Sequence, residues 1–174
     1  GFHLHDKHPL ADAIAHVWKK KKLPVEKGKR TLEDKAGTGA DPKFEVGELR
    51  YASPTRSYVQ IDCVGRDEAV ITRAFKAGIP IAGAVLVAKV KLGADMTIEP
   101  TVREHMIAAT NAGLRHLVIF LDGCASYDGM DMNLELESEA REVPSKYGYD
   151  VDGTPVIFGD LAGALAGDAA WEAS

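Results

Sequence analysis

The feature that most constrains the fold is a nearly continuous apolar run from Ile81 to Val90. A strand with one solvated face alternates apolar and polar residues, whereas this run offers apolar side chains to both faces, as buried strands of a parallel sheet do. Residues 116–121 form a second apolar run, and residues 100–112 between the two have helical spacing after Pro100. The two runs therefore predict parallel strands joined by a crossover helix.

Strands and helices are expected to alternate along most of the chain. Further strands are predicted at 58–64 and 155–158, and further helices at 9–22, 66–77, 133–143 and 161–165. Residues 25–43 are polar and predict a loop of about twenty residues. We expect a three-layer α/β fold in which helices cover both faces of a parallel sheet, within one domain spanning residues 1–174.

The composition sets limits on partners and location. The net charge of −5 gives no global preference for nucleic acid, and the lysines at 19–22 are expected to form a solvated helix end. No apolar run reaches the roughly 18 residues of a membrane span, so we expect no membrane partner and a cytoplasmic location. Cys63 and Cys124 are expected to be reduced, small buried side chains.

Three aspartates follow predicted strands, where ligands bind in parallel sheets. Asp62, Asp122 and Asp160 would line one rim and could hold Mg²⁺, which takes oxygen ligands. The favoured alternative for each is a cap on the following helix or turn.

A pair of histidines near the start suggests a second, weaker metal hypothesis. His3 and His5 would share one side of an extended segment, and with Asp6 nearby they could bind Zn²⁺. A frayed polar terminus is the favoured alternative.

Several short segments match a known family in order and spacing. They are Tyr51–Tyr58, the Asp62-Cys63-Val64-Gly65 turn, Arg103-Glu104-His105, Val118–Leu121, and Gly153-Thr154-Pro155-Val156-Ile157 with Gly159. The match continues through Ala164-Leu165, Gly167-Asp168 and Trp171-Glu172. On these residues, 51–173 resembles the guanine-nucleotide domain of elongation factor Tu, a translational GTPase.

The resemblance implies a P-loop GTPase fold that binds GTP or GDP with Mg²⁺ and acts in protein biosynthesis. Its implied partners are aminoacyl-tRNA and the ribosome, although residues 1–174 do not include the two further domains that hold tRNA in that family, so we do not expect this chain alone to deliver tRNA. The implied phosphate-binding positions are Gly1, Lys7, His8 and Gly65, and the implied Mg²⁺ ligand is Asp62. The implied base-binding positions are Asp122, Ala125, Asp160 and Leu161, and Arg66 occupies the place of the catalytic histidine.

The departures from the family pattern fall on the chemical residues. Asp6 replaces the second glycine of the phosphate loop, His8 replaces the metal-binding threonine, and the strand expected before this loop is absent or truncated. Ala125 replaces the carboxylate that pairs with guanine. We therefore expect impaired nucleotide binding and hydrolysis.

Three interpretations of these departures remain open. The chain is a diverged or redesigned pseudo-GTPase, a nucleotide binder that uses Lys7, Asp62 and Gly65 with poor base selectivity, or an elongation factor whose sequence is imperfectly recorded. The alternative function, from a different class, is a catalytically silent scaffold or interaction domain.

Overall fold

A computed structural model describes residues 9–33, 43–62, 72–74, 77–78, 80–90, 101–124 and 130–172. The chain divides into two compact units, Gly1–Ile81 and Ala82–Ser174. Several predicted site residues lie outside the described residues, namely Gly1, His3, His5, Lys7, His8, Cys63, Gly65, Arg66 and Ala125. Asp62, Asp122, Cys124, Asp160 and Leu161 lie within them.

The first unit opens with helix α1, Pro9–Lys20, which confirms the predicted helix. Pro9 suits the first helical position because its missing N–H would have no partner there. Leu10, Ala13 and Val17 are among the buried residues of its apolar face. The helix ends where Lys22 takes a left-handed conformation at φ 56° and the Leu23 N–H donates to the Trp18 carbonyl at 2.9 Å.

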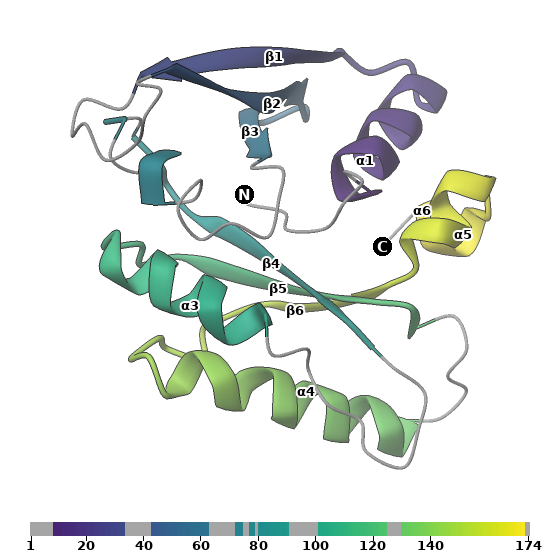
Figure 1. Ribbon diagram of the computed structural model, residues 1–174. Coiled ribbons are helices and arrows are strands. Elements are labelled where there is room, and N and C mark those ends of the chain that lie inside the picture. Colours follow the sequence, from purple (N-terminus) through teal and green to yellow (C-terminus); the bar gives the residue numbers. More distant parts are fainter. Residues whose placement is uncertain are drawn as a thin grey trace. The chain divides into compact units, whose positions relative to one another are not determined.

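Three antiparallel strands follow, β1 (Val25–Glu33), β2 (Lys43–Ala52) and β3 (Ser57–Asp62), in the order β1-β2-β3 (Figure 1). The prediction of a loop at 25–43 is wrong for residues 25–33, because β1 pairs with β2 along its whole length. The predicted strand at 58–64 forms, but its placement in the parallel sheet is wrong, because β3 pairs antiparallel with β2.

Helix α1 packs against one face of this antiparallel sheet. Ala11 and Ala15 of the helix contact Leu49 of β2 in the core, with Ile14, Val25 and Tyr51 around them. Small alanines allow the helix and sheet backbones to approach closely, which buries the apolar face of α1.

The second unit contains the parallel sheet that the apolar runs predict. Strands β4 (Ala84–Lys89), β5 (Leu117–Asp122) and β6 (Val156–Gly159) are all parallel, with β5 in the middle. Helices α3 (Thr101–Asn111) and α4 (Met130–Ser145) lie side by side on one face of it (Figure 1). The chain continues after β6 as α5 (Leu161–Ala166) and α6 (Ala169–Glu172). The α/β class with a parallel sheet is confirmed.

Helix α4 differs in length from the prediction, because it runs through Pro144 to Ser145 instead of ending before it. Proline is tolerated here because only the last turn loses a hydrogen bond, and Pro144 is fully buried. One turn earlier, Arg141 donates to the carbonyls of Val151 and Thr154, the second at 2.9 Å. This arginine fastens α4 to the segment that leads into β6.

Across the described ranges, we find no helix with both the length and the apolarity needed to cross a membrane.

Candidate functional site

The carboxyl ends of the parallel strands bring together three predicted site residues. Asp122 ends β5 and is 9% exposed, and Gly159 of β6 is its partner in the register. The Asp122 Oδ1 accepts the backbone N–H of Leu161 at 2.9 Å, and the Gly123 N–H donates to the Gly159 carbonyl at 3.1 Å. The segments after β5 and β6 are therefore joined through both backbone and side chain.

Asp160 acts at the same place as the N-cap of α5. Its backbone is extended, with φ −136° and ψ 102°, and its Oδ1 accepts the Ala162 N–H at 3.1 Å. Asp122 satisfies the Leu161 N–H, so two carboxylates share the first N–H groups of one helix. The capping alternative is confirmed for Asp160, and Asp122 holds the same helix start from a neighbouring strand.

Two glycines make this close approach possible. Gly123 has φ +93°, a conformation that L side chains rarely adopt. A Cβ at Gly159 would lie 2.4 Å from Phe120 Cζ, so any larger residue would displace that ring. The loops at this edge therefore depend on glycine for backbone conformation and for space.

Cys124 lies beside these aspartates and is buried, as predicted. Its thiol donates to the Leu121 carbonyl at 3.3 Å. Burial raises the pKa of this thiol above its ordinary value, and the carboxylates of Asp122 and Asp160 raise it further against the lowering effect of a backbone hydrogen bond from Gly159. The thiol is thus protonated at neutral pH, which suits a packing residue better than a nucleophile.

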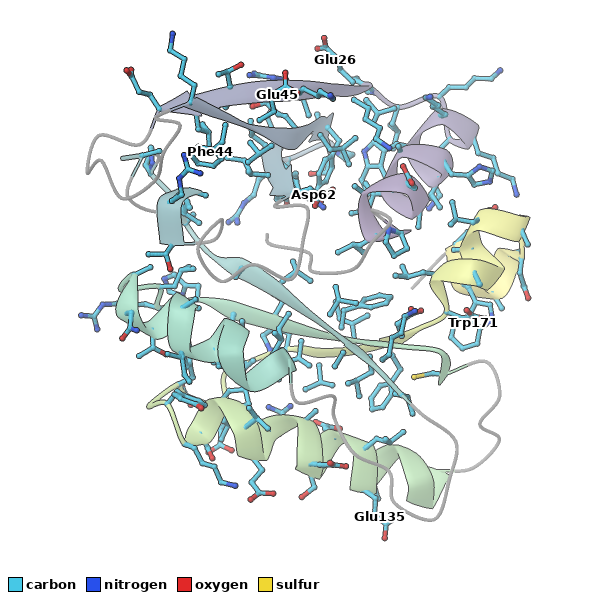
Figure 2. All side chains as sticks on the ribbon, viewed as in Figure 1. Glu26, Phe44, Glu45, Asp62, Glu135 and Trp171 are labelled. Atoms are coloured by element: carbon cyan, nitrogen blue, oxygen red, sulfur yellow. The ribbon has the colours of Figure 1, made fainter. Side chains whose placement is uncertain are left out.

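Asp62 lies on a different sheet from Asp122 and Asp160. It is the last residue of β3 (Figure 2), opposite Gly47 of β2, and is 4% exposed. The predicted rim of three aspartates at parallel strand ends is therefore wrong, because β3 belongs to the antiparallel sheet. Among the residues that the structure describes, no three His, Cys, Asp or Glu side chains form a metal-binding group.

Asp62 nevertheless lines a cavity whose wall combines charged and apolar residues. The Gln60 Nε2 donates to the Asp62 Oδ1 at 3.2 Å, and Asp62 lines a cavity of about 270 Å³. Ala11, from the first turn of α1, lines the same cavity. The cavity therefore has both the buried Asp62 carboxylate and a residue of the first turn of α1 in its wall.

Sequence reasoning missed four charged residues in the wall of this cavity. Lys27 and Lys29 extend from β1, and Glu45 and Glu48 extend from β2. Lys27 pairs with Asp12 of α1, and the Lys29 Nζ donates to Glu45 at 3.0 Å. Lys27 and Lys29 are two residues apart, so a strand over residues 25–33 would have placed both side chains on the same face.

These features define an α/β protein with a capped helix start beside its parallel sheet and a cavity beside Asp62 of its antiparallel sheet. A scan against protein-family models finds none that matches this chain.

Proposed function

We propose that this chain is a GTP- and GDP-binding domain of the translational GTPase class, of the elongation factor Tu type, with impaired nucleotide binding and hydrolysis. The proposal includes a three-layer P-loop fold over residues 1–174, Mg²⁺ as cofactor, and a cytoplasmic role in protein synthesis with aminoacyl-tRNA and the ribosome as partners. The observation that carries it is the hydrogen bond from the Leu161 N–H to Asp122. This bond joins the two segments that the resemblance assigns to the base.

The arrangement at the parallel sheet is one in which a base can bind. Ligands of open parallel sheets bind outside the carboxyl ends of the strands, where Asp122 and Leu161 lie. The Asp122 carboxylate is buried and engaged with the Leu161 N–H, so it supports the loop and does not face a base edge. The carboxylate that pairs with guanine in the family is Ala125 here. Guanine selectivity should therefore be weak.

The resemblance assigns the phosphate and Mg²⁺ positions to residues of the first unit. Asp62, the implied Mg²⁺ ligand, is buried and lines a cavity together with Ala11 of α1. Lys7 and the Gly65 N–H would contact phosphate oxygens, while the Asp6 carboxylate would repel them. Arg66 cannot replace a neutral histidine that orients water, so hydrolysis should be slow.

Titration calorimetry with GDP, GTP and ATP in the presence of Mg²⁺ tests this function. We expect heat with GDP and GTP, a weaker Mg²⁺ dependence in Asp62→Asn, and a stronger preference for GDP over ADP in Ala125→Asp. Asp150→Asn is the matched control, because Asp150 is an exposed aspartate outside both regions. Absence of heat with all three nucleotides in a folded protein would contradict the proposal and support the silent scaffold.

A further inference from the structure

The net charge of the whole chain conceals a strong difference between its two units. Residues 1–81 contain 15 Lys and Arg against 11 Asp and Glu, a net charge of +4, whereas residues 82–174 contain 6 against 15, a net charge of −9. Such asymmetry is typical of chains in which one part meets a polyanion.

Positive charge gathers at one end of the first unit. The lysine run, Lys19 to Lys22, is exposed and closes α1, with the Lys22 N–H donating to the Lys19 carbonyl at 3.0 Å. The turn between β2 and β3 lies at the same end, since Trp18 Nε1 donates to the Ala52 carbonyl at 2.9 Å. That turn carries the exposed Arg56, whose N–H donates to Ser53 Oγ at 3.1 Å. The lysine run and Arg56 therefore lie on backbone segments that are held by hydrogen bonds.

An aromatic row, Trp18, Tyr51 and Tyr58, begins beside this charge. The Trp18 ring meets the Tyr51 ring edge-on at 5.3 Å, and the Tyr51 ring stacks on that of Tyr58 at 5.0 Å with 17° between the planes. Tyr58 lies near the start of the edge strand β3 and is 39% exposed. The Tyr51 ring therefore fixes the orientation of the Tyr58 ring, which reaches solvent.

We propose that this end of the first unit binds single-stranded nucleic acid. The lysine run and Arg56 contact successive phosphates, and an unpaired base stacks on Tyr58. An acidic protein surface would use the cations alone, whereas an exposed ring held by a second ring favours flat bases. The surface is distinct from the cavity of Asp62, because it adjoins the C-terminal end of α1 and the cavity adjoins the N-terminal end.

Fluorescence anisotropy with the full chain and a labelled 12-nucleotide oligothymidylate tests the phosphate contacts. The double variant Lys19→Gln with Lys22→Asn should bind at least about tenfold more weakly at low salt, and asparagine accepts the left-handed backbone of Lys22. Removing two phosphate contacts should lower the slope of log affinity against log salt by about 1.4. Lys146→Gln is the matched control, because Lys146 lies in the second unit and its side chain is 56% exposed.

The stacking contact is tested in the same assay by changing the ring alone. Tyr58→Ala should weaken binding at least about fivefold without altering the salt slope, while Tyr58→Phe should bind like the unmodified chain. Val59→Ala is the control, because Val59 is 49% exposed on the same strand and points to the other face. Thermal unfolding of each variant separates a lost contact from lost structure.

Three results would overturn the proposal. They are absence of oligothymidylate binding at 50 mM salt, equal binding by Tyr58→Ala and Tyr58→Phe, and displacement of the oligonucleotide by polyglutamate of equal charge at equal concentration. The last two results would assign the surface to an acidic protein instead. A failure of nucleotide binding in the calorimetric test leaves this prediction unchanged, since the lysine run, Arg56 and Tyr58 are not among the residues assigned to nucleotide binding.

Discussion

Replacing Asp122 by alanine tests whether one side chain holds the edge of the parallel sheet together. In the structure the Asp122 Oδ1 accepts the N–H of Leu161 at 2.9 Å, and both residues are buried. Alanine removes the acceptor and leaves the Leu161 N–H unsatisfied at the start of α5. Hydrogen bonds to charged groups contribute about 1.5–3 kcal/mol, so we expect Asp122→Ala to lower the free energy of unfolding by about 2–3 kcal/mol.

The expected loss is large enough to measure in two ways. For a chain of this size, 2–3 kcal/mol corresponds to a fall in Tm of about 4–12 °C. Hydrogen exchange gives a local measure, in which the Leu161 amide should lose about 30-fold or more of its protection, because 1.4 kcal/mol is a factor of ten.

Two matched variants make the test specific. Asp122→Asn keeps an oxygen acceptor and should lose less than half as much stability. Asp150→Ala removes an exposed aspartate that accepts the Gly153 N–H at 3.2 Å, and should cost less than about 1 kcal/mol. If Asp122→Ala and Asp122→Asn unfold at the same temperature, the hydrogen bond to Leu161 does not hold this edge and our reasoning is refuted.

Three further predictions concern strain, packing and pH. Gly123→Ala should cost about 1–2 kcal/mol in denaturant unfolding because of its φ of +93°, and Gly123→Asn should cost less; equal stability of all three proteins would contradict this. Gly159→Ala should cost about 1–3 kcal/mol because its Cβ would meet Phe120 Cζ at 2.4 Å, and Phe120→Leu in the same chain should recover part of the loss, which a double-mutant cycle measures as a coupling different from zero. Burial, and secondarily Tyr58, raises the pKa of Tyr51 above its ordinary value of 10.0, so the folded chain keeps a proton that the unfolded chain releases. The stabilisation from burying the protonated Tyr51 side chain is present below pH 10 and is lost as the pH rises through the raised pKa. Above pH 10, the free energy of unfolding should therefore fall less steeply in Tyr51→Phe than in the unmodified chain.

The second unit could be predicted from sequence because its information is local. The apolar run that contains β4 favours a strand of a parallel sheet, and Pro100 places the start of α3 one residue later, at Thr101. Asp160 precedes an apolar helix, which is the usual place for an N-cap. Each of these choices depends on a few neighbouring residues.

The antiparallel sheet could not be predicted because its strands depend on one another. Most side chains of β1 are polar and exposed, so no alternation of apolar residues marks the strand. Its backbone is extended because β2 pairs with it, and strand preference of this kind depends on context. In β2 the alternation of apolar and polar residues is interrupted at Glu48. Its carboxylate oxygens lie 2.5 Å from the Arg30 Nε and 2.7 Å from the Arg50 Nε. Sequence reasoning placed Arg30 in a loop and did not assign Arg50 to any element, so these ion pairs could not be expected.

The candidate site divides in the same way. The resemblance placed Asp122 and Leu161 at one site, and the structure joins them by a hydrogen bond. The position of Asp62 could not be derived, because an alternating strand fits a parallel or an antiparallel partner equally well. Lys27 and Lys29, which share the cavity with Asp62, became visible only when β1 was seen as a strand.

The order of the parallel sheet has a consequence for how the chain emerges during synthesis. Strand β5 can pair with β4 as soon as both have left the ribosome, whereas β6, its other neighbour, is made later. The Leu161 N–H, which the Asp122 carboxylate accepts, is synthesised 39 residues after Asp122. A nascent chain that stops between Asp122 and Leu161 lacks the N–H that this carboxylate accepts in the folded chain. The carboxylate must then be hydrated, so that end of the sheet stays open to water. Arrested chains ending before residue 156 should therefore be digested by proteases near residue 122, and chains that extend past α5 should resist digestion there.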